Sequence, residues 1–146
     1  MAFENVNVTS LRNSLNQCKN AINHSTTDGL ISSVSNASAW QSSAQSNLKN
    51  ALSKLTNTRY KELENKLSNY QNTVNFIEKY QDLQSENKSK QQEIDYLNYK
   101  LYKTNSQTGK KEKDANVDAK ISKLRKQINY NKTEMDNLIN RVSNSI

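Results

Sequence analysis

Proline is absent from the chain, and glycine occurs only twice, as Gly29 and Gly109. Because these two residues are the strongest breakers of regular structure, their scarcity lets helices run for long stretches. Only 33% of the residues are hydrophobic, which is less than globular domains usually contain. A broad hydrophobic core is therefore not expected. Narrow apolar seams between paired helices need fewer hydrophobic residues and fit this composition. The composition predicts an all-α protein, with residues 1–146 forming a single helical domain.

Cysteine is almost absent, and the sequence lacks signals for membranes and general secretion. Cys18 is the one cysteine; it cannot form an internal disulfide, and we expect it to be a small buried residue in a helical seam. The segment MAFENVNVTS has no basic stretch followed by an apolar one, so no Sec-type signal is expected. No window approaches the ~20 apolar residues of a membrane-spanning helix, and no span is expected.

Groups typical of catalysis are equally scarce. The single histidine, His24, lies in a polar segment, and no zinc-protease, nucleophile-elbow or phosphate-loop motif occurs. Carboxylates such as Glu62 and Glu64 are two residues apart and so face different sides of a helix. We therefore expect no enzymatic activity, no metal, no cofactor and no small-molecule substrate.

The charge is strongly basic, with a net value of +7. The excess is greatest in residues 105–146, which hold nine Lys and Arg against five Asp and Glu. Such an excess of positive charge is typical of proteins that bind nucleic acid or an anionic membrane. However, the basic residues alternate with acidic ones and no aromatic–basic platform accompanies them. We therefore expect these basic residues to form a solvated helix face rather than a surface that binds nucleic acid.

The first helix is predicted over residues 8–37, with Thr9 or Ser10 as its cap. Apolar residues recur there with the steps of a heptad seam, namely Val8, Leu11, Leu15, Cys18 and Ile22. Asp28-Gly29 either breaks this helix or is a weak turn within it. A turn follows at 38–42, where Ser38 and Gln41 have the spacing of a capping box. Trp40, the only tryptophan, either closes the end of a hairpin or presents an apolar surface to a partner, and the two roles are compatible.

A second, long helix is predicted over residues 42–104. Its seam includes Leu48 and Leu52 and continues through Leu55, Leu63, Tyr70, Ile77 and Tyr80 to Ile94 and Leu101. The polar stretch 84–92 interrupts the seam, and a kink or a solvated segment is expected there if anywhere. Residues 105–114 have no periodicity and are predicted to be a loop.

The third helix is predicted over residues 115–146, with Asp114 or Asn116 as its cap. Its seam has the most regular spacing in the chain, through Val117, Ile121, Leu124, Ile128, Asn131, Met135, Leu138 and Val142. Asn131 occupies an interior position, where a polar residue lowers stability but fixes register and partner choice.

The helix lengths indicate a topology of two antiparallel hairpins that share the long helix. Such a protein would be an elongated, coiled-coil-like rod. A compact bundle, with the long helix broken near 84–92, is the alternative. Since each hairpin buries only one seam, isolated pairs of these polar helices would be marginal. We therefore expect a helical partner, either a second copy or another protein.

The sequence resembles the Trp-X-Gly (WXG) family of Gram-positive type VII secretion, because an amphipathic helix is followed by a turn with tryptophan and then by a second amphipathic helix. The resemblance rests on Trp40-Gln41-Ser42 followed by Ala44, Leu48 and Leu52, and covers at most residues 8–80. Ser42 stands where the family has glycine. The resemblance implies helical hairpins, export by a non-Sec route and recognition by the secretion ATPase. It is greatest to the small helical proteins that bind the helical N-terminal domain of LXG toxins.

The same family carries an export signal in which an acidic residue follows an aromatic residue by four positions. Tyr130 with Glu134 and Tyr60 with Glu64 have this spacing, which places both groups on one helix face. Tyr130 is the better candidate, although a tyrosine that merely covers the seam would fit as well.

Together these features predict a non-enzymatic export partner that binds an LXG-type toxin, alone or with a second small helical protein. It would be cytoplasmic before export, and whether it leaves the cell with its cargo is open. A free-standing coiled-coil scaffold of a phage or cell surface is the first alternative. A basic, nucleic-acid-binding rod is the second.

Overall fold

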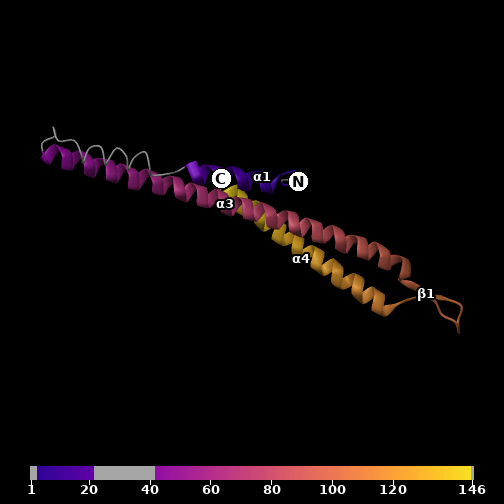
Figure 1. Ribbon diagram of the computed structural model, residues 1–146. Helices are drawn as coiled ribbons and strands as arrows, with labels where there is room; N and C mark the ends of the chain where they lie inside the picture. Colours follow the sequence, from indigo (N-terminus) through magenta and orange to yellow (C-terminus); the bar gives the residue numbers. More distant parts are fainter. Residues whose placement is uncertain (1–2, 22–41, 146) are drawn as a thin grey trace. The chain divides into compact units, whose positions relative to one another are not determined.

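The computed structural model describes residues 3–21 and 42–145, which are mostly helical (Figure 1). Helix α1 spans Val8–Ala21, α3 spans Ser42–Lys100 and α4 spans Ala115–Ser145. The predicted all-α fold with a long central helix is therefore confirmed. The chain falls into two compact units, one made of Met1–Val6 and Asn75–Ile146 and the other of Asn7–Val74.

Helix α3 runs without a break through the polar stretch 84–92. No proline or glycine lies in it, and polar side chains bridge successive turns on its surface. The Lys90 ammonium lies 3.0 Å from the Glu86 carboxylate, and Gln91 donates a hydrogen bond to Asp95 at 2.9 Å. Both pairs have the i, i+4 spacing that supports a helix. The alternative fold with a broken long helix is therefore wrong.

A short β-hairpin replaces the end of the predicted long helix and the predicted loop. Helix α3 ends at Lys100, and β1 (Tyr102–Thr104) pairs antiparallel with β2 (Lys111–Lys113). Asn105 organises the turn, because its side-chain oxygen accepts hydrogen bonds from the amides of Gln107 and Thr108. Gly109 has a positive φ of 66°, a conformation that glycine adopts without strain. The segment is thus an ordered turn rather than an irregular loop.

The second half of α3 and the whole of α4 form an antiparallel pair (Figure 1). Side-chain contacts move backward along α4 as they move forward along α3. Arg141 lies over the ring of Phe76, Asn131 bonds to Asn87, and Ile121 packs in one cluster with Ile94. The cluster centres on Ile94, Ile121 and Ile128, with Leu97, Leu101, Val117 and Leu124 around it.

The N-terminal residues add a short cover to this pair. The ring of Phe3 meets that of Tyr80 edge to face, with centroids 5.3 Å apart. Gln81 donates from its amide nitrogen to the carbonyl oxygens of Phe3 and Val6, each at 2.8 Å. An aromatic contact and two hydrogen bonds thus hold residues 3–6 on α3.

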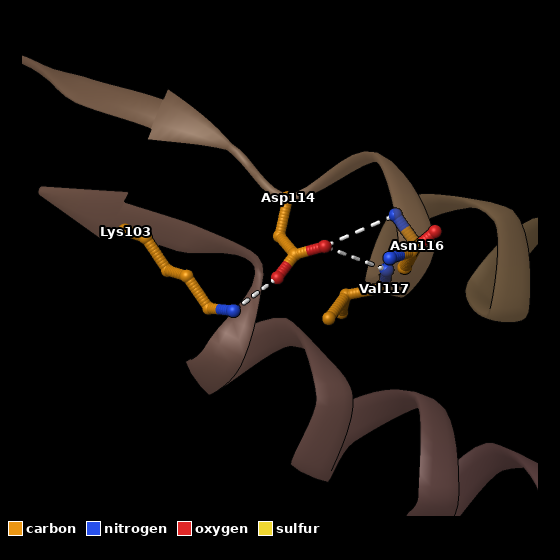
Figure 2. A network of polar contacts seen from close by, with 4 residues as sticks. All are labelled: Lys103, Asp114, Asn116 and Val117. Atoms are coloured by element: carbon orange, nitrogen blue, oxygen red, sulfur yellow. Dashed lines mark hydrogen bonds and ion pairs between the residues drawn. The ribbon is translucent and has the colours of Figure 1, made fainter. Parts of the chain in front are cut away.

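The caps of α1 and α4 are both side chains that precede the helix. Asn7 accepts the amide hydrogen of Ser10 at 3.0 Å, so Asn7 caps α1 and the predicted cap at Thr9 or Ser10 is wrong. At α4 the predicted cap Asp114 is confirmed. One oxygen of its carboxylate accepts the amides of Asn116 and Val117, and the other pairs with the Lys103 ammonium (Figure 2).

These contacts favour the ionised form of Asp114. The Lys103 ammonium, followed by the Val117 amide, holds the pKa of Asp114 below its ordinary value of 3.8. Because the folded state lowers this pKa, the carboxylate stabilises the fold above pH ~4, and the stabilisation is lost as the pH falls through the lowered value. The same side chain therefore caps α4 and joins it to β1.

Replacing Asp114 with Asn should lower the melting temperature at neutral pH, because the ion pair with Lys103 and the charge at the start of α4 disappear. The difference from the unmodified protein should shrink as the pH falls below 4. Thermal denaturation followed by circular dichroism between pH 7 and 2.5 measures this. Asp136→Asn is the control, since Asp136 is exposed on the same helix. Equal shifts for the two variants at every pH would contradict the assigned role.

Candidate partner-binding surfaces

The seam of α4 lies in the interface with the second half of α3. Ile121, Ile128 and Leu138 have exposed fractions of 2%, 7% and 2%. Leu124 is half-buried and packs against the same cluster. This unit therefore covers its own aliphatic seam, and little of the α4 seam remains for a partner.

A polar layer crosses the interface where the α3 seam is interrupted. Asn131 is 6% exposed, and its amide nitrogen donates to the side-chain oxygen of Asn87 at 3.0 Å. The amide nitrogen of Asn87 in turn lies 3.8 Å from the Met135 sulfur. Because a buried amide without a partner is costly, this pair favours the one register in which the two asparagines meet.

Charged groups extend the polar layer to the surface. Hydrogen bonds, first from Lys90 and then from Asn131, hold the pKa of Glu86 below its ordinary value of 4.5. A shallow groove beside these groups is lined by Glu86, Lys123, Lys126, Gln127, Tyr130 and Asn131. The buried amide pair is therefore continuous with an exposed patch that carries charges of both signs.

The first half of α3 buries its predicted seam much less well. Leu48 and Leu52 are half-buried, while Leu55 and Leu63 are 56% and 45% exposed. Thr56 is buried instead, and its hydroxyl donates to the Leu52 carbonyl at 2.8 Å. The buried line thus follows i, i+4 steps through residues 48, 52 and 56, and the predicted seam position at Leu55 is wrong.

Helix α1 also leaves apolar surface open. Leu15 is half-buried, but Leu11 is 38% exposed and Cys18 is exposed, so the predicted burial of these two is wrong. A groove in this unit is lined by Arg12, Leu15, Asn16, Lys19, Glu64, Leu67, Ser68 and Gln71. Its two leucines are flanked by charges of both signs, as at the rim of a protein interface.

The two tyrosine–acid pairs lie in different surroundings. Tyr130 is 68% exposed and lines the groove beside Glu86, while Glu134, one turn further along α4, is half-buried. Tyr60 is half-buried, and Glu64 is exposed and lines the groove of the α1 unit. The ring at Tyr130 is therefore the more accessible of the two.

The predicted tryptophan turn lies mostly outside the described residues. Ile22, Ser38, Trp40 and Gln41 all fall in the segment 22–41, and Ser42 is the first residue of α3. The resemblance to the WXG family therefore remains a prediction at its defining residues.

Several contacting residues were not identified from the sequence. Phe3 precedes any periodic segment, and Gln81 sits between two seam residues, so neither follows a helical pattern. Asn87 lies within the polar stretch 84–92 that interrupts the seam of the long helix. An asparagine at a seam position in each of two predicted antiparallel helices is the signal that would have identified the pair.

Within residues 3–21 and 42–145, no group of three or more His, Cys, Asp or Glu side chains is placed to hold a metal ion. No helix in these ranges is long and apolar enough to cross a membrane. Comparisons of the chain with protein-family models, curated proteins and solved structures found no match.

Replacing Asn131 with Ala should lower the free energy of unfolding by about 1–3 kcal/mol, because Asn87 loses its partner in the interface. Asn87→Ala should act through the same bond, so the double variant should lose less than the two single losses added together. Urea denaturation followed by circular dichroism measures all three. Asn137→Ala, at an exposed site on α4, should change little. Additive losses would show that the two amides act independently.

Proposed function

We propose that this protein is a non-enzymatic partner of type VII secretion, which binds the helical N-terminal domain of an LXG-type toxin and aids its export. The observation that carries the proposal is the apolar surface on α1 and the first half of α3. Leu11, Leu55 and Leu63 are 38%, 56% and 45% exposed, although each lies on an amphipathic helix. Exposed leucines on amphipathic helices are what a helical partner would cover.

The energetics support a partner on this face. Full burial of a leucine side chain contributes roughly 1.5–3 kcal/mol, so each half-exposed leucine leaves about half of that available. The interface between α4 and the second half of α3 offers no comparable apolar surface, because its seam is covered within the unit. Binding energy would therefore come chiefly from α1 and the first half of α3.

The patch at Tyr130 would serve targeting rather than toxin binding. Tyr130 is 68% exposed, and Glu134 follows it on the same face of α4. The accessible ring of Tyr130 and the Glu134 carboxylate, one turn apart, can bind together to a receptor such as the secretion ATPase. On this proposal the protein resides in the cytoplasm before export by a non-Sec route.

Co-expression with the protein encoded by the adjacent gene should yield a complex of fixed stoichiometry by size-exclusion chromatography with light scattering. The double variant Leu55→Asp/Leu63→Asp should lose this complex while keeping its helical circular dichroism, because both side chains are already exposed. The double variant Asn57→Asp/Asn65→Asp is the control, since it adds the same two charges at exposed sites on the same helix.

Two outcomes would contradict the proposed function. A stable homo-oligomer that is indifferent to the neighbouring protein would favour a free-standing coiled-coil scaffold. A complex that survives the leucine substitutions unchanged would place the partner elsewhere on the molecule.

Replacing Tyr130 or Glu134 with Ala should abolish export in the source bacterium without weakening the complex, because neither residue belongs to the apolar face of α1 and α3. Immunoblots of culture supernatant and cell pellet, with the purified complex as a second readout, measure the two effects. Tyr60→Ala tests the other tyrosine–acid pair and should leave export unchanged. Normal secretion of the Tyr130 and Glu134 variants would remove the targeting role.

A further inference from the structure

Tyrosine is concentrated where α3 meets the β-hairpin. Three of the seven tyrosines of the chain lie within residues 96–102. Tyr96, Tyr99 and Tyr102 are 57%, 90% and 58% exposed, and the Lys100 ammonium lies 4.3 Å from the ring centre of Tyr96. Large aromatic rings exposed together in this way are typical of a binding surface.

The strand register places lysines next to one of these rings. Tyr102 pairs with Lys113 and Thr104 pairs with Lys111 across the hairpin. Because alternate residues of a strand share a face, these four residues form one surface, which we call the Tyr102 face. Directly paired side chains have Cβ atoms about 4.5–5.5 Å apart. The strand register therefore places an aromatic residue and two lysines on one face, a grouping that the sequence pattern did not indicate.

The acidic residues of the hairpin lie away from the Tyr102 face or are already engaged. Glu112 pairs with Lys103 on the opposite face and accepts a hydrogen bond from Asn105 at 3.1 Å. Asp114 binds Lys103 and caps α4. Lys113 lies 3.5 Å from Asp118, whereas no ion pair joins Lys111 to another of the described residues. The Tyr102 face thus carries two lysines, of which Lys113 lies beside the Asp118 carboxylate and Lys111 has no ion pair with a described residue.

We propose that the Tyr102 face binds a short stretch of single-stranded nucleic acid. A base would stack on the ring of Tyr102, and the flanking phosphates would pair with Lys111 and Lys113. Tyr99, three residues before Tyr102 and 90% exposed, offers a second ring for a neighbouring base. Exposed rings combined with basic side chains are what proteins use to hold single strands without sequence preference.

The geometry favours this ligand over an anionic membrane. Residues at the tip of the turn, Ser106, Gln107 and Thr108, are polar, so no apolar side chain there can enter the acyl region of a lipid bilayer. Tyr102, Lys111 and Lys113 lie on one face of the hairpin, which suits a strand that crosses that face. The inference does not depend on the proposed function, because the Tyr102 face shares no residue with the apolar face of α1 and α3.

The test is fluorescence anisotropy of a short labelled oligothymidylate titrated with the full-length protein at several salt concentrations. Tyr102→Ala should weaken binding about tenfold, the size of one base-stacking contact. Tyr102→Phe keeps the ring and should bind like the unmodified protein, whereas Tyr102→Leu should not. The double variant Lys111→Ala/Lys113→Ala should also reduce the slope of log affinity against log salt by about 0.7 per lysine.

Matched controls separate the Tyr102 face from general basicity. Tyr130→Ala and the double variant Lys54→Ala/Lys61→Ala remove the same groups from exposed sites elsewhere, and both should bind the oligonucleotide normally. The proposal is overturned if Tyr102→Ala binds as tightly as the unmodified protein. It is also overturned if heparin, which has charge but no bases, competes as well as the oligonucleotide does. Preferential binding to vesicles of anionic phospholipid would assign the face to a membrane instead.

Discussion

The antiparallel register between α4 and the second half of α3 is the constraint on which the rest of this unit depends. With 33% hydrophobic residues, the interface is narrow, and its aliphatic side chains alone specify the register weakly. The bond between Asn87 and Asn131 favours one register, because any other would leave a buried amide without a partner. The same register brings Arg141 to Phe76 and Ile121 to Ile94. A polar pair therefore provides specificity, while the aliphatic residues around it provide stability.

The two compact units are built from similar amphipathic helices but differ in how much of their aliphatic surface is buried. In one unit the seams of α3 and α4 cover each other, and the N-terminal residues add Phe3 against Tyr80. In the other, Leu11, Leu55 and Leu63 are substantially exposed. An amphipathic helix that leaves leucines in water forgoes part of its hydrophobic stabilisation. The two units therefore differ in how much of their aliphatic surface they bury within themselves.

The β-hairpin shows how a small connection generates a surface with its own chemistry. Six paired residues reverse the chain, and Asp114 joins the second strand to the start of α4 by capping that helix and binding Lys103. The pairing then sorts the charged residues by face, with Glu112 on one side and Lys111 and Lys113 beside Tyr102 on the other. An ordered hairpin fixes which of these side chains share a face, whereas a flexible loop of the same composition would not.

The sequence by itself determined the helical class, the long central helix and the α4 seam, and it limited the cap of α4 to Asp114 or Asn116. These features depend on periodicity and on contacts a few residues apart, which a single chain segment contains. The partner of Asn131, the cover by Phe3 and the Tyr102 face depend on residues that are distant in sequence. Nothing local in Tyr102–Thr104 or Lys111–Lys113 marks a strand, and only their pairing across the turn makes them one. Tertiary structure decided these features, because register between segments, rather than the pattern within them, sets which side chains meet.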